Sequence, residues 1–194
     1  MKTLINIILC IIFCVNLKVC GQQNLVPNPS FESYTTCPSA PNNISDLTNW
    51  FCSGGSPDYF NACATANFFS VPYNFGGHQF AANGNAYAGF ITYAGAASSY
   101  REFISNTLTT SLTVGTKYFI SFKVCMSINL GYSTGSANYA SNKIGAKFST
   151  MPYSIASPPT LNNSATFFTN NIVSDSVNWT RLSGSFIADS SFKY

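Results

Sequence analysis

Hydrophobic and polar residues alternate with a period of two in three stretches of the chain, residues 86–93, 118–124 and 180–188. Such alternation is typical of antiparallel strands that bury one face and expose the other. Turn-forming Gly, Pro, Asn and Ser residues separate these stretches. After the first 21 residues, no stretch longer than about ten residues has a helical pattern with capping residues. The pattern therefore predicts an all-β fold, a sandwich of antiparallel strands.

The alternation also assigns side chains to faces. In residues 118–124 the inward positions are Tyr118, Ile120, Phe122 and Val124. In residues 180–188 the inward positions are Leu182, Gly184, Phe186 and Ala188, and the outward ones are Arg181, Ser183 and Ser185. In residues 86–93 one face carries Tyr87, Gly89, Ile91 and Tyr93, and the other carries Ala88, Phe90 and Thr92. Each stretch is expected to form a half-buried strand.

Two segments interrupt the strand pattern. Residues 37–84 contain one short apolar step, Trp50-Phe51, and are otherwise rich in Pro, Asn, Ser and Gly. A long irregular connection in a compact domain usually serves function or is held by a cross-link. We expect Trp50 to pack in the core. Residues 128–142 combine Gly with Ser and Asn and are expected to form a mobile loop.

The first 21 residues read as a secretory signal peptide. Lys2 precedes an apolar run of about a dozen residues, and small residues stand before the expected cleavage site after Gly21. A membrane-spanning helix needs about 20 apolar residues, which this run does not reach. Alternatives are an uncleaved anchor or a lipid anchor on Cys20. The prediction is a signal peptide over 1–21, one domain over 22–194, and a secreted or cell-surface location.

Four of the seven cysteines lie after the signal peptide: Cys37, Cys52, Cys63 and Cys125. An exported chain meets oxidising conditions, and four cysteines allow three pairings. We favour Cys37–Cys63, because both lie in turn-rich sequence. Cys52 and Cys125 would then form a second disulfide or remain thiols. No CxxC pair with a nearby histidine supplies the ligand spacing of a zinc site.

Composition narrows the classes of function. The chain is 46% hydrophobic and 15% aromatic, which is enough to form a core. Only 8% of its residues are charged, and six carboxylates with one histidine disfavour acid–base catalysis. Its nine basic residues form no run, although the net charge is +3, so a nucleic-acid partner is not expected. These features favour a binding or structural module over an enzyme.

Several segments occur in an order that resembles a known family. Residues 24–32 read Asn-Leu-Val-Pro-Asn-Pro-Ser-Phe-Glu, and further matching pieces are 57–63, 84–89, 100–104, 112–118 and 179–186. Together they resemble an exported module of Bacteroidetes related to the galactose-binding-like, jelly-roll carbohydrate-binding domains. The resemblance implies a jelly-roll sandwich and noncatalytic carbohydrate binding. Modules of this kind continue into a last strand beyond the position of Tyr194, so we expect the fold to lack its closing strand.

Sugars present an apolar C–H face and a rim of hydroxyls, so a site for them needs flat aromatic rings and planar polar groups. The candidate carbohydrate-binding residues are Asp58, Tyr59, Asn61, Tyr87, Tyr93 and Arg101. For each of them the alternative is an ordinary structural role in packing, turns or ion pairs. In the opening segment, Asn28, Ser30 and Glu32 place oxygen atoms at alternate positions. That arrangement suits a hard cation, so calcium is a candidate ligand.

Two other functions remain open. The first is a structural or adhesion module that docks other proteins of the cell envelope. The second is a glycoside hydrolase, which would need two carboxylates at a controlled separation across the scissile bond. Because the six carboxylates are spread singly along the sequence, the hydrolase is the weakest of the three.

Overall fold

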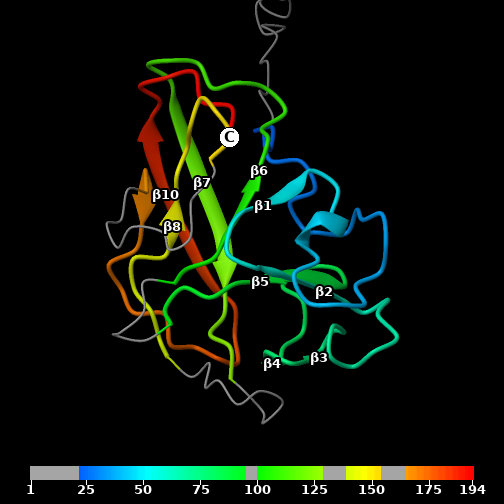
Figure 1. The fold of residues 1–194 in the computed structure, drawn as a ribbon. Helices are drawn as coiled ribbons and strands as arrows, with labels where there is room; N and C mark the ends of the chain where they lie inside the picture. Colours follow the sequence, from blue (N-terminus) through cyan, green and yellow to red (C-terminus); the bar gives the residue numbers. More distant parts are fainter. Residues whose placement is uncertain (1–21, 95–99, 129–138, 154–164) are drawn as a thin grey trace, which may run out of the picture.

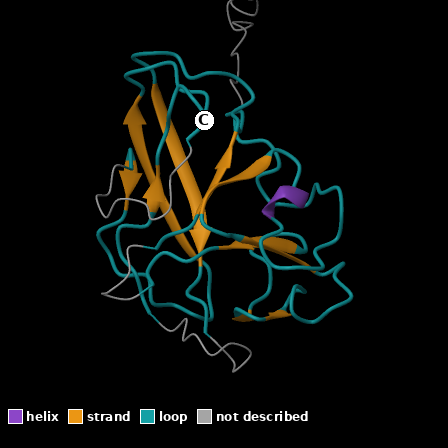
Figure 2. Cartoon of the chain, viewed as in Figure 1, coloured by secondary structure: helices purple, strands orange, loops and turns teal. Residues whose placement is uncertain are grey.

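The computed structural model describes residues 22–94, 100–128, 139–153 and 165–194 (Figure 1). Strands dominate these residues, and the helical structure among them is a single 3-10 turn, η1 (Ile44–Asp46) (Figure 2). The predicted all-β class is confirmed. The part of the chain described here contains no helix that is long and apolar enough to cross a membrane.

The strands pair in two nested sets, and every ladder is antiparallel. The first set contains β1 (Trp50–Gly54), β2 (Asp58–Asn61), β3 (Tyr73–Asn74), β4 (Gly77–His78), β5 (Ala86–Gly89) and β6 (Phe103–Asn106). In it β1 pairs with β6, β2 with β5, and β3 with β4. In the sequence, β3 and β4 lie between β2 and β5, and these in turn lie between β1 and β6. Residues 50–106 therefore follow the path of one long hairpin, interrupted between its ladders.

The second nested set forms the other side of a sandwich-like arrangement (Figure 1). It contains β7 (Lys117–Val124), β8 (Gly145–Ala146), β9 (Phe167–Phe168) and β10 (Thr180–Ile187). β7 and β10 pair without interruption from Thr180 opposite Val124 to Ile187 opposite Lys117. The short β8–β9 pair falls between them in sequence. Nested antiparallel hairpins are compatible with a jelly roll, whose full connectivity stays a prediction.

The face assignment is confirmed for β7 and β10. Their burial alternates residue by residue, with Tyr118, Ile120, Phe122 and Val124 facing inward on β7. On β10 the more buried positions include Leu182, Gly184 and Phe186. These two strands are long enough for the period-two pattern to be visible in the sequence.

Two expectations about the first set were wrong. The strand expected over 86–93 ends at Gly89. Beyond it, the backbone N–H of Ile91 donates to the Glu102 carboxylate, and its carbonyl accepts the N–H of Glu102. These bonds replace a continued ladder. Residues 37–84, expected to be irregular, contain β1, β2, β3 and β4, because strands of two to five residues are too short to show clear alternation.

Two clusters form the hydrophobic core. The first buries Ile44, Leu47, Tyr59 and Ala86 and is flanked by Phe31, Trp50, Ala88 and Ile104. Trp50 packs there as expected, with its ring centroid 4.9 Å from that of Phe31. The second buries Leu108, Leu112 and Ala188, with Tyr118, Phe148, Phe186 and Phe192 among the surrounding side chains.

The opening segment is bonded tightly to the first cluster. The Asn28 carbonyl accepts the Phe31 N–H at 3.2 Å and the indole N–H of Trp50 at 2.9 Å. The Asn28 amide nitrogen donates to the carbonyls of Ser33 and Thr48, and its Oδ1 accepts the Ser33 N–H. Asn28 has φ 47°, a left-handed conformation that Asn tolerates better than most residues. The segment is therefore bonded to Thr48, just before β1, and to Trp50, the first residue of β1.

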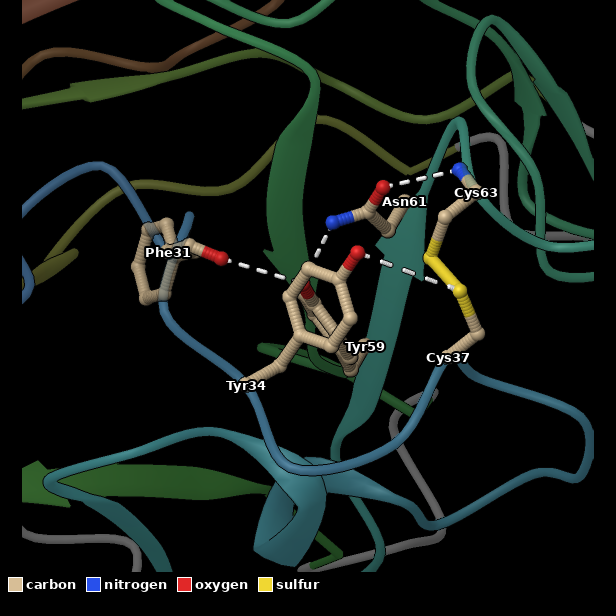
Figure 3. The surroundings of a disulfide bond; sticks show 6 residues. All are labelled: Phe31, Tyr34, Cys37, Tyr59, Asn61 and Cys63. Atoms are coloured by element: carbon tan, nitrogen blue, oxygen red, sulfur yellow. Dashed lines mark hydrogen bonds between the residues drawn. A yellow bond between two sulfur atoms is a disulfide. The ribbon is translucent and has the colours of Figure 1, made fainter.

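A chain of hydrogen bonds joins this segment to the disulfide (Figure 3). The Tyr59 hydroxyl donates to the Phe31 carbonyl at 3.0 Å and accepts from the Asn61 amide at 2.6 Å. Asn61 Oδ1 in turn accepts the N–H of Cys63 at 2.8 Å. The predicted Cys37–Cys63 disulfide is confirmed. Cys52 is exposed and Cys125 partly buried, and both are free thiols.

Replacing Asn28 by alanine should lower the free energy of unfolding by about 2 kcal/mol. The change removes three hydrogen bonds. It also places alanine, which adopts the left-handed region less readily than asparagine, at a positive φ. Urea denaturation measures the loss. The control is Asn24→Ala, since Asn24 makes one local bond to the Val26 N–H and its loss should cost below about 0.5 kcal/mol. Equal effects of the two variants would contradict the assigned role of Asn28.

Removing the disulfide should cost about 3 kcal/mol. Cys37 and Cys63 are 26 residues apart, and the chain-entropy relation for a loop of that length gives a stabilisation of about 3.5 kcal/mol. The double variant Cys37→Ser/Cys63→Ser should therefore unfold at much lower denaturant than the parent chain. Cys52→Ser, which changes an exposed thiol, serves as the control. A double variant as stable as this control would refute the prediction.

Candidate functional site

A cleft of about 680 Å³ lies where the β2–β5 ladder meets the ends of β7 and β10. Asp58 and Phe60 of β2 and Tyr87 of β5 form one side. The end of β7, the residues that follow it, and Trp179 just before β10 form the other. Both nested sets thus contribute to its walls, and their packing sets its width.

A continuous series of aromatic rings joins the two sides of the cleft. The antiparallel register places Phe60 directly opposite Tyr87, and their ring centroids are 5.4 Å apart. Tyr87 also contacts Trp179 in an edge-to-face geometry with a centroid distance of 5.6 Å. On the other side Phe60 meets Phe75 at 5.3 Å. Such contacts fix the planes of the rings, so a ligand would meet a preformed apolar surface.

Tyr87 is held by a polar contact as well. Its hydroxyl accepts a hydrogen bond of 2.6 Å from the Asn74 amide, which also donates to the Ser70 carbonyl. Asn74 Oδ1 accepts the N–H of Gly76. Burial raises the pKa of Tyr87 to about 12, so the hydroxyl stays protonated at neutral pH. Tyr87 therefore offers the cleft a neutral ring in a fixed orientation.

Asp58 is a perturbed carboxyl group in this cleft. It stands at the start of β2, is partly buried, and accepts the N–H of Asn42 at 2.9 Å. Burial raises the pKa of Asp58 from 3.8 to about 6, the Asn42 bond opposes this shift, and the negative charge of Glu102 adds to it. Asp58 therefore changes between its neutral and charged forms around pH 6 and is mostly charged at pH 7.

Glu102 also borders the cleft, but its oxygens already accept hydrogen bonds from the protein. Its side chain is buried, with 5% of its surface exposed. One oxygen accepts the Ser56 N–H, the Ser56 hydroxyl and the Tyr100 hydroxyl, and the other accepts the Ile91 N–H. Gly55 has φ +75°, and a Cβ there would lie 2.6 Å from the Glu102 side chain. Glu102 thus joins the turn after β1 to the residues after β5.

Of the six predicted carbohydrate-binding residues, Asp58, Tyr87 and Tyr93 line the cleft. Tyr93 is at its rim with 38% of its surface exposed. Arg101 lies beside it, with its guanidinium carbon 5.1 Å from the centroid of the Tyr93 ring. One of its nitrogens donates to the Tyr100 carbonyl at 2.6 Å. The structure therefore gathers four of the six residues.

The other two, Tyr59 and Asn61, do not line the cleft. Their exposed surfaces are 0% and 3%, and their polar groups bond to each other, to Phe31 and to Cys63. The physical reason is the period of the strand. Residues 58–61 form the strand β2 and not a loop, so alternate side chains point to opposite faces. Asp58 and Phe60 border the cleft, whereas Tyr59 and Asn61 face the core.

The three candidate calcium ligands are close in sequence but are bonded within the protein. Asn28 Oδ1 accepts the Ser33 N–H, and one Glu32 oxygen accepts the Asn85 N–H at 2.8 Å. Ser30 lies in the turn between them. Within the described ranges, no group of three or more His, Cys, Asp or Glu side chains is arranged to hold a metal ion. A calcium site at Asn28, Ser30 and Glu32 stays a prediction.

Part of the cleft was not predicted from the sequence. The lining residues that were not foreseen include Phe60, Phe75, Gln79 and Trp179. Phe60 could have been found, because it stands two positions after Asp58 on the same strand face. Trp179 carried no such signal, since long-range packing brings it to the site.

Comparison of the chain with protein-family models, with curated proteins and with solved structures found no match. Function is therefore inferred from the geometry of the cleft.

Replacing Asp58 by asparagine should stabilise the protein at pH 7 by about 2 kcal/mol, and this gain should vanish toward pH 4. The folded-state pKa of Asp58 is raised from 3.8 to about 6, so its ionisation costs stability as the pH rises through this window. A shift of this size is worth at most about 3 kcal/mol, and partial exposure reduces the effect. Urea denaturation at several pH values measures it.

Asp175→Asn is the matched control, with the opposite sign. The N–H groups of Asn178 and Val177 lower the pKa of Asp175, so its charged form stabilises the folded protein at neutral pH and this contribution is lost in acid. The control should therefore be less stable than the parent at pH 7. A stability difference for Asp58→Asn that does not change with pH would disprove the assignment.

Proposed function

We propose that this chain is a noncatalytic carbohydrate-binding module of a secreted or cell-surface protein, and that the cleft holds its sugar. The proposal rests on one observation, the wall of oriented aromatic rings facing polar side chains in an open cleft of about 680 Å³. Sugar recognition needs this combination, because the C–H face of a sugar packs on rings while its hydroxyls need hydrogen-bonding partners.

The rim of the cleft supplies the most accessible of these groups. Tyr93 and Tyr139 are 38% and 61% exposed and meet edge to face, with centroids 5.9 Å apart. Arg101 lies over the Tyr93 ring, and its planar guanidinium can donate to paired oxygens. Deeper in the cleft, Asp58 and Gln79 supply further polar groups. A sugar ring stacked on Tyr93 would have hydrogen-bonding partners on either side.

The state of the carboxylates supports binding rather than bond cleavage. A glycoside hydrolase uses one carboxyl as acid and a second as base or nucleophile. Asp58 and Glu102 both border the cleft, which the sequence did not suggest. Both oxygens of Glu102 are, however, engaged by four protein donors. Glu102 is therefore suited to holding the fold and poorly suited to proton transfer with a substrate.

The confirmed disulfide agrees with an extracellular location, since such bonds persist in oxidising compartments. The signal peptide over residues 1–21 and the likeness to galactose-binding-like modules point the same way, but both remain expectations from sequence, and residues 1–21 lie outside the described part of the chain.

A structural or adhesion module is the second candidate, and the β3–β4 hairpin favours it. Tyr73 and Phe80 are 54% and 66% exposed and lie on either side of His78, with ring centroids 4.4 and 5.4 Å from it. Exposed aromatic residues of this kind are enriched where proteins contact one another. Tyr73 and Phe80 do not line the cleft, although His78 between them in sequence does, so substitutions of these two rings test the adhesion function separately.

Replacing Tyr93 by alanine should weaken binding to the best ligand found on a glycan array about tenfold, since stacking of an aromatic ring is worth about 1 kcal/mol or more. Calorimetric titration measures the affinity. The matched control is Tyr73→Ala, which removes an exposed tyrosine of the hairpin and should leave sugar affinity unchanged. No glycan signal, together with binding of an envelope protein that Tyr73→Ala abolishes, would instead support the adhesion function.

A further inference from the structure

The outward side of the β7–β10 ladder carries eight exposed side chains in register. We call this surface the outer face. It consists of Lys117, Phe119, Ser121 and Lys123 of β7, and Arg181, Ser183, Ser185 and Ile187 of β10. The ladder pairs them directly across the strands. The two long strands β7 and β10 lie side by side without interruption (Figure 1). Because the other side of this ladder packs inward, the outer face is a preformed surface.

Charge is distributed unevenly on the outer face. Arg181 stands directly opposite Lys123, and Lys117 lies at the far end of the same strand. Like charges at directly opposite positions of an antiparallel ladder are destabilising. None of the eight positions holds a carboxylate, and the nearest acids along β10, Asp175 and Asp189, lie outside the strand. An anion bound between the two cations would relieve this repulsion.

A hollow of about 420 Å³ lies next to Arg181. It is lined by Gln22, Phe119, Ser121 and Ser183 to Ser185 as well as by Arg181 itself. Nη2 of Arg181 donates a long hydrogen bond of 3.4 Å to the Ser121 hydroxyl. At the other end of the hollow, the Phe119 ring has 68% of its surface exposed. The hollow thus combines a cation, hydroxyl groups, an amide and an apolar ring.

We infer that the outer face binds an anionic polysaccharide, one that carries carboxylate or sulfate groups on its sugars. The guanidinium of Arg181 donates hydrogen bonds to the acidic group, and Lys123 adds a second positive charge. The serine hydroxyls and the Gln22 amide bond to sugar hydroxyls, and Phe119 supports a C–H face. Lys117 and Lys123 are six residues apart along the strand, about 20 Å at 3.4 Å per residue, so the surface can follow several sugars of a chain.

The centre of the outer face favours a polysaccharide over a lipid surface. Three serines occupy its middle positions, and Ile187 is its one aliphatic residue. A membrane-binding surface would instead insert several apolar side chains between basic ones. Lys123 also borders the cleft, whereas Arg181 does not line it, so Arg181 separates this site from the one in the proposed function.

The test uses Arg181→Gln, which removes the positive charge from an exposed side chain and relieves its repulsion with Lys123, so the variant should not unfold at a lower temperature than the parent chain. Its probes are oligogalacturonate, dextran sulfate and neutral dextran, measured by calorimetric titration at low and high salt. We expect at least one of the two anionic probes to bind and neutral dextran not to bind this face. Arg181→Gln should weaken the bound probe about tenfold and reduce the salt dependence of binding. The two anionic probes separate carboxylate from sulfate recognition.

Two control variants keep the outcome unambiguous. Lys143→Gln removes a positive charge from outside the outer face and should leave binding of the anionic probes unchanged. Tyr93→Ala should also leave it unchanged, so failure of the cleft and failure of the outer face give different results. The inference is overturned if neither anionic probe binds. It is equally overturned if Arg181→Gln and Lys143→Gln weaken binding alike, or if anionic vesicles or polyglutamate bind as tightly as the polysaccharides.

Discussion

The attachment of the opening segment to the first core cluster is the constraint on which the rest of this structure depends. One carbonyl, that of Asn28, accepts both the N–H that closes its own turn and the indole N–H of Trp50. From there the bonds run through the buried Tyr59 hydroxyl to Asn61 and the disulfide. Strands as short as β2 and β5 would hold poorly by their own ladder. The segment and the disulfide supply the support that strand length does not.

This support leaves the opposite face of β2 and β5 available for a cleft. Alternation along β2 directs Tyr59 to the first core cluster and Phe60, which is itself buried with 3% of its surface exposed, to the side of the cleft. One short strand therefore contributes to both the interior and the site. Phe60 and Tyr87 face each other across the ladder, and Trp179 reaches them from the approach to β10. The rings are thus fixed by two separate nested sets. The site is a consequence of how those sets pack, and residues of the connecting segments, among them Phe75, Gln79 and Tyr93, complete its lining.

The features that could be predicted from the sequence were those with a local signature. β7 and β10 are eight residues long, so their alternation was visible and their faces were assigned correctly. The disulfide followed from turn-rich sequence around Cys37 and Cys63. The strands between residues 50 and 78 were missed because each is at most five residues long. The burial of Tyr59 and Asn61 was not foreseen for the same reason. Trp179 reaches the cleft only through contacts between residues distant in sequence.

The nested pairing of the strands also bears on the route by which the chain can fold. Asn74 pairs with Gly77 across a tight turn, and β2–β5 and then β1–β6 enclose that turn at increasing sequence separation. The entropy of closing a loop grows with its length, so each inner pair, once formed, shortens the loop that the next pair must close. Zipping outward from residues 74–77 is therefore the least costly order of assembly for the first set, although contacts of such long range are usually slow to form.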